Sequence, residues 1–237
     1  MSGSKERTSV VLVHGAWADG SSWSDVIGPL LSQELRVVAA PIPLTSLSDD
    51  VAALDHTLER VESPVVLVAH AYAGAVIGAT TNQRVQALVY VAALAPDEGE
   101  TVAEVFYREK PYPNAPQLTP DAHGLIWLPR EAFATAFAQH ASPQRVALFA
   151  ATQRPIAVAC IQEKATTPAW RAKPSWYLIA EEDRMISPHT QRFMAERMGA
   201  RIRSEKVDHL PLVTAPLPVV EVILEAVGSL APPVMTR

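Results

Sequence analysis

An acid and a histidine follow two late segments of the chain that are predicted as strands, and their side chains could form a proton-transfer pair. Asp183 comes soon after the run 176–180, and His209 comes directly after the run 201–207. A carboxylate that binds one ring nitrogen of a histidine fixes its tautomer and leaves the other nitrogen free to take a proton. We expect Asp183 rather than Asp208 to be the acid, because neighbouring residues rarely face each other.

The residue that should supply the nucleophile is missing. Residues 65–77 combine a short apolar run, a turn of small residues and the start of a helix. In such a strand–turn–helix elbow the central residue carries the nucleophile, and small residues two positions before and after it allow the tight turn. Ala69 and Ala73 supply the small residues, but Ala71 occupies the centre. The sequence therefore contains the position of a nucleophile without a nucleophilic side chain.

A glycine turn after the first apolar run could stabilise negative charge. The segment His14-Gly15-Ala16-Trp17 follows the run 9–13. Backbone N–H groups in such a turn can bind a developing oxyanion together with the N–H of the residue after the nucleophile. We expect Ala16 and Tyr72 to supply these two donors. The His14-Gly15 dipeptide alone is equally typical of a simple turn at the end of a strand.

Composition excludes several classes of protein. The 237 residues carry a formal net charge of -5, and no basic stripe is available to neutralise the phosphates of a nucleic acid. The single cysteine, Cys160, excludes an intrachain disulfide and a cysteine-rich zinc site, and we expect it to be a small buried residue. The segment 1–8 is polar, and the apolar run after it ends at His14, so we expect this run to be too short for a secretion signal or a membrane span. We expect a cytoplasmic protein, a monomer or homodimer, that binds no membrane and no nucleic acid.

Apolar runs of strand length alternate with helical stretches along most of the chain. The runs 9–13, 36–40, 65–69, 87–92, 176–180 and 201–207 predict strands, and helices are predicted at 22–31, 51–61, from 75, from 188 and at 217–230. The strands are almost continuously apolar, which is typical of a parallel sheet covered on both faces. The chain therefore predicts an α/β fold with a mostly parallel sheet of about six strands flanked by helices.

This alternation stops between residues 96 and 173. The segment contains several prolines and the helical pieces 130–139, 143–152 and 155–162. We interpret it as a helical cap inserted after the fourth strand, with residues 1–95 and 174–237 forming the core. A long connection without a binding role is the alternative, but long segments inside a compact domain are usually functional.

Aromatic residues of the cap suggest an apolar substrate pocket. Trp17 is expected to contribute from the core, and the cap would contribute Phe106, Tyr107, Trp127 and Phe133. The same cap residues could instead form the cap's own small core, and the sequence does not decide between the two. The histidines at positions 56, 123, 140 and 189 show no pairing and are expected at the surface or in the cap. No histidine–carboxylate spacing indicates a metal site, and no cofactor is expected.

In combination these motifs resemble the α/β-hydrolase superfamily. The chain is similar to its small capped branch, which includes plant methyl esterases, hydroxynitrile lyases and bacterial esterase homologues. The resemblance rests on residues 11–17 with Ser22-Trp23, residues 68–74 apart from Ala71, the run 176–180 leading to Asp183 and residues 186–188, and Asp208-His209. It implies the α/β-hydrolase fold, with Ala71 at the nucleophile position, His209 as general base, Asp183 as its acid, and Ala16 and Tyr72 as the oxyanion hole.

The resemblance implies a serine-type hydrolase that cleaves a small apolar ester or lactone. We favour Ala71 as an engineered Ser→Ala change that leaves substrate or product binding intact, because a natural loss should also relax the other site residues. A natural ligand-binding pseudo-hydrolase is the alternative. A lyase of the hydroxynitrile type is less favoured, because it would need the serine and a cap lysine, for which Lys164 and Lys173 are the only late-cap candidates.

Overall fold

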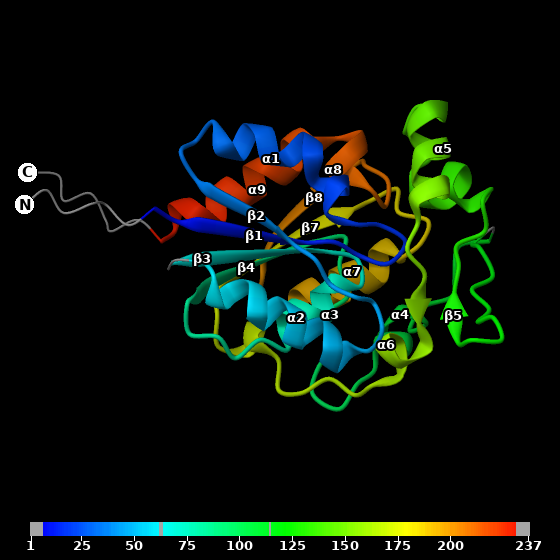
Figure 1. The fold of residues 1–237 in the computed structure, drawn as a ribbon, viewed down its shortest axis with the longest axis horizontal. Coiled ribbons are helices and arrows are strands. Elements are labelled where there is room, and N and C mark those ends of the chain that lie inside the picture. The colour runs from blue at the N-terminus through cyan, green and yellow to red at the C-terminus, as the bar shows by residue number, and fades with distance from the viewer. Residues whose placement is uncertain (1–6, 62–63, 114, 231–237) are drawn as a thin grey trace, which may run out of the picture.

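Six short strands form one parallel sheet in the computed structural model, which describes residues 7–61, 64–113 and 115–230 (Figure 1). The strands are β1 (Ser9–Val13), β2 (Arg36–Ala40), β3 (Val65–His70), β4 (Val85–Val91), β7 (Ser175–Ala180) and β8 (Arg201–Glu205). Their order across the sheet is β2-β1-β3-β4-β7-β8, and every neighbouring pair is parallel. This confirms the predicted sheet. Residues 1–6 of the polar segment at the start of the chain lie outside the described residues.

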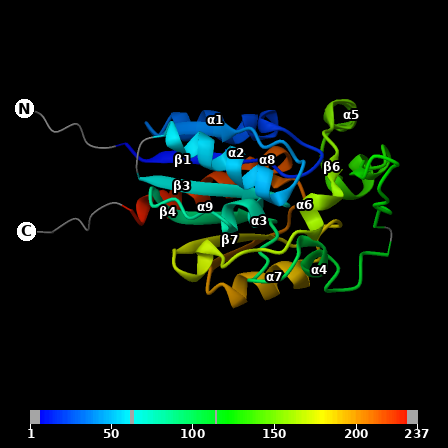
Figure 2. The same ribbon diagram turned by 60° about the horizontal axis from the view of Figure 1, so that its bottom comes forward.

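Helices cover both faces of the sheet (Figures 1 and 2). Helices α1 (Ser24–Leu31), α8 (Pro211–Thr214) and α9 (Pro216–Gly228) lie on one face, and α2 (Leu47–Glu59), α3 (Ala73–Gly78) and α7 (Pro188–Arg197) lie on the other. A short 3-10 turn, η1 (Gly20–Trp23), precedes α1. Within the described residues no helix combines the length and the apolar character needed to cross a membrane.

Local capping explains where two of the helices begin. The Ser46 side chain accepts a hydrogen bond from the amide of Asp49 at the start of α2. The Ser187 side chain accepts one from His189, and Pro188 occupies the first position of α7, as the sequence predicted. A side-chain oxygen satisfies one of the orphan N–H groups of the first turn, and proline has no N–H to lose there. These caps fix the loops that lead away from the carboxyl ends of β2 and β7.

The connection between β4 and β7 extends past the carboxyl ends of the strands (Figure 1). It contains α4 (Val102–Phe106), β5 (Leu125–Ile126), η2 (Phe133–Phe137), α5 (Pro143–Thr152), β6 (Ile156–Ala157), α6 (Val158–Gln162) and η3 (Ala169–Arg171). We call residues 96–173 the cap. The helix predicted at 143–152 matches α5, whereas the one predicted at 130–139 is a five-residue π-helix.

The cap is not purely helical. Strands β5 and β6 pair antiparallel, so the helix predicted at 155–162 begins as a strand and becomes helical only at Val158. A strand of two residues is too short to show an alternation of apolar and polar residues, so the sequence pattern did not reveal β5 and β6. We call β5 and β6 together the cap sheet.

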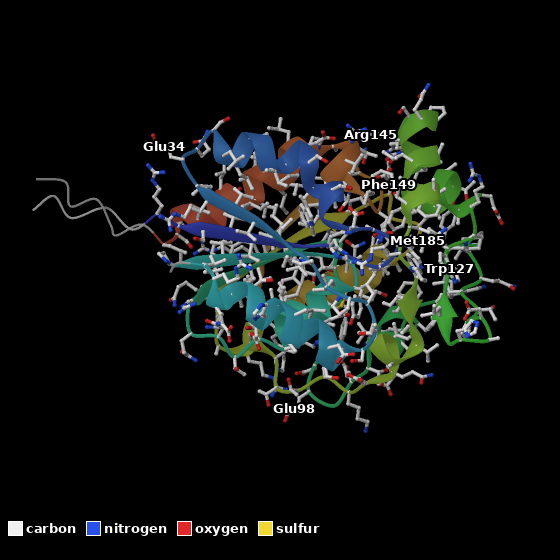
Figure 3. The ribbon with its side chains drawn as sticks, viewed as in Figure 1. Glu34, Glu98, Trp127, Arg145, Phe149 and Met185 are labelled. Atoms are coloured by element: carbon white, nitrogen blue, oxygen red, sulfur yellow. The ribbon has the colours of Figure 1, made fainter. Side chains whose placement is uncertain are left out.

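Polar contacts fasten the cap to the core. Arg145 of α5 forms a two-pronged ion pair with Asp25 of α1, with a closest distance of 2.6 Å (Figure 3 labels Arg145). The Glu163 carboxylate accepts the amide of Ser48 at 2.9 Å, and the amide of Ala157 donates to the carbonyl of Leu44 at 3.0 Å. The cap is therefore attached to both helical layers.

Candidate active site

Because parallel strands end at the same edge of a sheet, the loops after β1, β3, β7 and β8 meet under the cap. The loop after β1 carries Ala16 and Trp17, and Ala71 follows β3 directly. Asp183 lies in the loop after β7, and His209 in the loop after β8. The fold thus brings together residues that are far apart in the sequence.

His209 and Asp183 form the expected pair. Nδ1 of His209 lies 2.8 Å from Oδ2 of Asp183, and both side chains are almost fully buried. The Asp183 carboxylate also accepts the side-chain amide of Gln191 at 2.8 Å and the backbone amides of Met185 at 2.7 Å and Ile186 at 2.9 Å. With these four contacts the carboxylate cannot turn away from the imidazole, so Nδ1 of His209 carries the proton and Nε2 is the atom left to act as a base.

His70 and Phe137 hold the histidine loop in place. Nε2 of His70 donates to the main-chain oxygen of His209 at 2.7 Å, and the two imidazole rings lie 4.9 Å apart. The Phe137 ring of the cap lies 5.3 Å from the His209 ring. Burial, reinforced by the neighbouring His209, places the pKa of His70 well below its ordinary value. His70 is therefore a neutral structural residue that donates a hydrogen bond.

The elbow at Ala71 has the strained backbone of a nucleophile turn. Ala71 has a φ of 51°, in the left-handed region that residues with a side chain rarely adopt. Its carbonyl accepts the amides of Gly74 at 3.2 Å and Leu94 at 2.9 Å. A Cβ at Gly74 would lie 2.2 Å from the carbonyl oxygen of Leu94, so only glycine fits. Sequence analysis identified Ala69 and Ala73 as the small residues of the turn but missed this requirement at Gly74.

The turn after β1 lies against the same residue. A Cβ at Gly15 would lie 2.9 Å from the Cβ of Ala71, so glycine is required for this close approach. The amide of Trp17 is occupied, because it donates to the carbonyl of Arg154 at 3.0 Å. Within the described residues no acceptor is bound to the amides of Ala16 and Tyr72. These two residues flank Ala71, and their amides are the donors available for a ligand oxygen.

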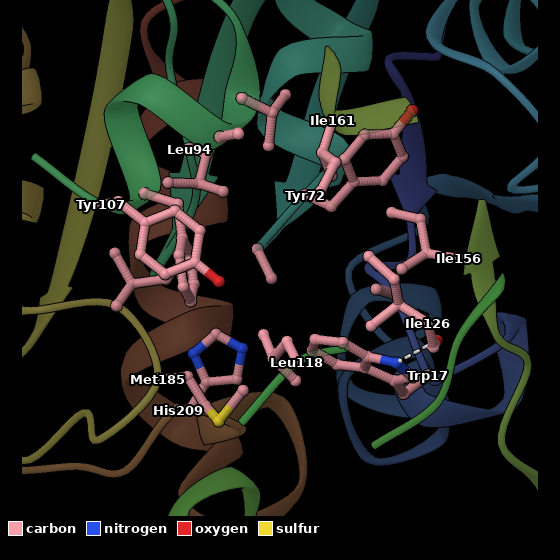
Figure 4. Close-up of a pocket in the computed structure, with 16 residues that line it drawn as sticks. Trp17, Tyr72, Leu94, Tyr107, Leu118, Ile126, Ile156, Ile161, Met185 and His209 are labelled. Carbon is pink, nitrogen blue, oxygen red and sulfur yellow. Dashed lines mark hydrogen bonds between the residues drawn. The ribbon is translucent and has the colours of Figure 1, made fainter. Parts of the chain in front are cut away.

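An apolar cavity opens above Ala71 (Figure 4). The cavity has a volume of about 70 Å³. Among the residues of its walls, only His209 and two tyrosines carry an ionisable group. The full lining is Ala16, Trp17, Ala71, Tyr72, Leu94, Val102, Ala103, Phe106, Tyr107, Leu118, Ile126, Ile156, Ile161, Met185, Ile186 and His209. Such a cavity suits an uncharged, apolar ligand.

The predicted substrate-binding residues divide into two groups. Trp17, Phe106 and Tyr107 line the cavity. Trp127 does not, since its side chain is largely exposed and its indole donates to Asp121 at 3.1 Å (Figure 3). Phe133 does not line it either, because it is fully buried and packs edge-on against Phe137, with ring centroids 5.3 Å apart. Trp127 therefore belongs to the surface of the cap, and Phe133 belongs to its core.

A buried acid behind the cavity was not found from the sequence. Asp50 of α2 is fully buried and accepts the Tyr72 hydroxyl at 2.7 Å and the Leu44 amide at 2.6 Å. Burial raises the pKa of Asp50 and raises that of the neighbouring Cys160 thiol to about 12. Cys160 is buried as expected. The only signal for Asp50 was its place in the first turn of α2, where an exposed acid is equally common.

His140 and the two late-cap lysines lie apart from the reacting centre. His140, expected to be unpaired, lies 3.2 Å from the Glu182 carboxylate, and its amide donates to buried Asp208 at 2.9 Å. It therefore joins the cap to the acid and histidine loops. Neither Lys164 nor Lys173 lines the cavity, and Lys173 instead donates to the carbonyl of Val85 at the start of β4. The lysine that lyase chemistry would need is therefore not supplied by Lys164 or Lys173.

Comparison with known proteins agrees with this geometry. A family model described as "Alpha/beta hydrolase family" matches residues 10–222. A search of curated proteins found no match.

Solved structures share the fold at low sequence identity. Polyneuridine aldehyde esterase is 19% identical with a TM-score of 0.80, covering 93% of this chain and 99% of that chain. A methylesterase from Arabidopsis is 17% identical with a TM-score of 0.76, covering 94% and 100%. A pyrethroid hydrolase from Sphingobium faniae JZ-2 is 19% identical with a TM-score of 0.74, covering 92% and 96%. At these identities the likeness defines the fold.

Proposed function

Because the chain belongs to the alpha/beta hydrolase family, we propose that its site is built to hydrolyse carboxylic esters or lactones through a serine at position 71. The observation that carries the proposal is the arrangement around Ala71. His209, bonded to Asp183, lies on the cavity wall, and the amides of Ala16 and Tyr72, which have no acceptor within the described residues, flank Ala71. These are the groups that acyl transfer needs besides its nucleophile.

Each group has a defined role in that reaction. The serine oxygen attacks the ester carbonyl carbon while its proton passes to Nε2 of His209. The carbonyl oxygen, now negative, is bound by the amides of Ala16 and Tyr72. The intermediate collapses, and His209 returns the proton to the leaving alkoxide. Water then attacks the acyl group in the same way, which releases the acid and restores the serine. Asp183 stabilises the charged imidazole in both halves.

The chain with Ala71 stops before the first of these steps. A methyl group can neither give up a proton nor attack a carbonyl, and removing the serine of a serine protease lowers kcat about a millionfold. The retained acid, base and amide donors support the interpretation that Ala71 replaces a serine. Since the cavity walls do not depend on the hydroxyl, substrate and product should still bind.

The cavity favours small apolar substrates. Its walls are aliphatic and aromatic, and no basic side chain lies among them besides His209. A charged ester would lose its hydration there without gaining a partner. This lining supports the proposal that the partner of the site is a small apolar ester or lactone, rather than a nucleic acid or a membrane. We also propose that the chain acts as a monomer or homodimer in the cytoplasm.

A binding protein is the second candidate, and Ala71 itself favours it. A chain that carries alanine at the nucleophile position could use the cavity to hold a ligand without reaction. The two candidates differ in what a serine would do at this position. A hydrolase site gains activity from it, whereas a site shaped only for binding does not.

Replacement of Ala71 by serine tests the proposal. Ala71→Ser is expected to hydrolyse p-nitrophenyl esters, with p-nitrophenol released as the acyl intermediate forms. The chain with Ala71 and the double variant Ala71→Ser/His209→Gln serve as matched controls and should remain inactive. If Ala71→Ser shows no activity with acyl chains of any length, the hydrolase proposal fails.

A further inference from the structure

We propose that Trp17 is a positioning residue that couples the cap to the oxyanion hole. The hydrogen bonds from Trp17 to the cap fix the conformation of the turn after β1. In this conformation the amide of Ala16 stays available for the ligand. The catalytic part of this inference rests on the proposed function, whereas the coupling between cap and turn can be tested independently of it.

The backbone of Trp17 is strained and held from outside the turn. Its φ is 59°, in the left-handed region. A bulky residue in this conformation persists only when surrounding contacts determine it. Trp17 is 7% exposed, and its ring forms part of the cavity wall. The contacts that hold it are therefore buried contacts beside the reacting centre.

Both N–H groups of Trp17 are bound by the cap. The backbone amide donates to the carbonyl of Arg154 at 3.0 Å, and the indole Nε1 donates to the carbonyl of Ile126 at 3.0 Å (Figure 4). Ile126 belongs to β5, and Arg154 comes two residues before β6 begins. One core residue is thus bonded both to β5 and to the segment that leads into β6.

The acceptor on the β6 side is itself anchored. The Arg154 guanidinium donates to the carbonyls of Ile42 at 3.0 Å and Pro43 at 3.3 Å, in the loop after β2. The Phe137 ring packs edge-on against Trp17, with centroids 6.2 Å apart. The cap carbonyl that receives the Trp17 amide therefore has a fixed position relative to the sheet.

This arrangement decides which amide of the turn faces the ligand. Two consecutive amides, of Ala16 and Trp17, are available after Gly15. The cap takes the second, and the first has no acceptor within the described residues. If the cap sheet shifts away, Trp17 loses both hydrogen bonds and its strained φ is no longer supported. The Ala16 amide would then leave its place beside Ala71.

Hydrogen exchange of the chain with Ala71 tests the coupling directly. Trp17→Phe keeps an aromatic ring but removes the indole N–H together with part of the ring's volume. We expect exchange of the residue 17 amide, and of the amides of Ala157 in β6 and Val158 in α6, to accelerate about fivefold, the effect of losing one hydrogen bond. Trp127→Phe is the matched control, since it removes an indole N–H from the same cap at the surface and should leave these amides unchanged. Unchanged exchange in Trp17→Phe overturns the coupling.

Kinetics in the Ala71→Ser background test the catalytic part. Loss of a complete oxyanion donor lowers kcat by about 100- to 1,000-fold, so a displaced donor should lower it about 10- to 100-fold, with KM changed by less than about threefold. A raised KM with unchanged kcat would mean that Trp17 is only a wall of the cavity, and would overturn the positioning role.

A second variant guards against a folding defect. Arg154→Met leaves the Trp17 ring in the cavity wall and releases the anchored carbonyl, so it should change exchange and kcat in the same direction. If Ala71→Ser is inactive with every ester, the proposed function fails, and the exchange experiment alone decides whether Trp17 couples the cap to the turn.

Discussion

Oδ2 of Asp183 lies 2.8 Å from Nδ1 of His209, although 26 positions separate the two residues in the sequence. The carboxylate is held by Gln191 and by two backbone amides, so it orients the imidazole without help from a nucleophile. The pair is therefore complete in a chain that carries alanine at position 71. The pair of His209 and Asp183 therefore forms even though no nucleophilic side chain is present at position 71.

Asp183→Asn should abolish most of the activity of the Ala71→Ser chain without unfolding it. The backbone amides of Met185 and Ile186 hold the remaining oxygen, so the asparagine NH2 group faces Nδ1 of His209 and cannot accept its hydrogen bond. His209 then takes the wrong tautomer, and kcat should fall about 10,000-fold. Ester hydrolysis and a thermal melt measure the two effects. Glu181→Gln, a change at an exposed residue paired with Arg192, is the control and should retain activity. A loss of less than about tenfold in Asp183→Asn would show that another group orients His209.

Gly74→Ala should destabilise the elbow strongly. The new Cβ would lie 2.2 Å from the Leu94 carbonyl oxygen, and Leu94 is itself bonded to Ala71. Relief requires a backbone shift, and we expect the free energy of unfolding to fall by about 3 kcal/mol or more. Urea denaturation measures it. Gly228→Ala in α9 meets no atom within 4 Å and should be neutral or stabilising by up to about 1 kcal/mol. Equal stability of the two variants would contradict the close packing at Gly74.

The larger elements could be predicted because burial on both faces imposes a clear pattern. Strand β1, in which all five residues are buried, was predicted with its observed ends. Asp183 and His209 were found because chain order and strand ends define their places in this fold. The sequence pattern was clear wherever a segment belongs to the parallel sheet.

Contacts across the cap could not be predicted, because they depend on short segments in which apolar residues show no regular spacing. Phe106 and Trp127 are both cap aromatics in sequence, yet only Phe106 reaches the cavity. Asp50 looks like an ordinary acid in the first turn of a helix, but it is buried against Tyr72. The bonds from Trp17 to Ile126 and Arg154 follow from how the cap sheet docks, which no single segment encodes.

Stability should fall as the solution becomes mildly acidic, and His70 should account for part of the loss. Its folded pKa lies well below the ordinary value of 6.5 because the ring is buried. The folded state therefore binds fewer protons than the unfolded state below pH 6.5, so the stability present above that pH is lost as pH falls through it. One such group contributes a loss of about 1.4 kcal/mol between about pH 7.5 and pH 5.5.

His70→Gln tests this assignment, because glutamine can still donate to the His209 carbonyl but does not titrate. The variant should lose less stability than the parent chain over the same pH range, measured by urea denaturation at several pH values. His56→Gln, at an exposed position of α2, is the control and should keep the parent pH dependence. Identical slopes for the parent chain and His70→Gln would mean that other groups cause the acid sensitivity.

Labelling of the Ala71→Ser chain with an alkyl fluorophosphonate, read by intact-protein and peptide mass spectrometry, tests the central claim most directly. The account predicts one phosphonyl group per chain on the residue at position 71, with no labelling of the chain with Ala71 and strongly slowed labelling after His209→Gln. If Ala71→Ser folds and yet takes up no label at that position, the site around Ala71 is not that of a serine hydrolase.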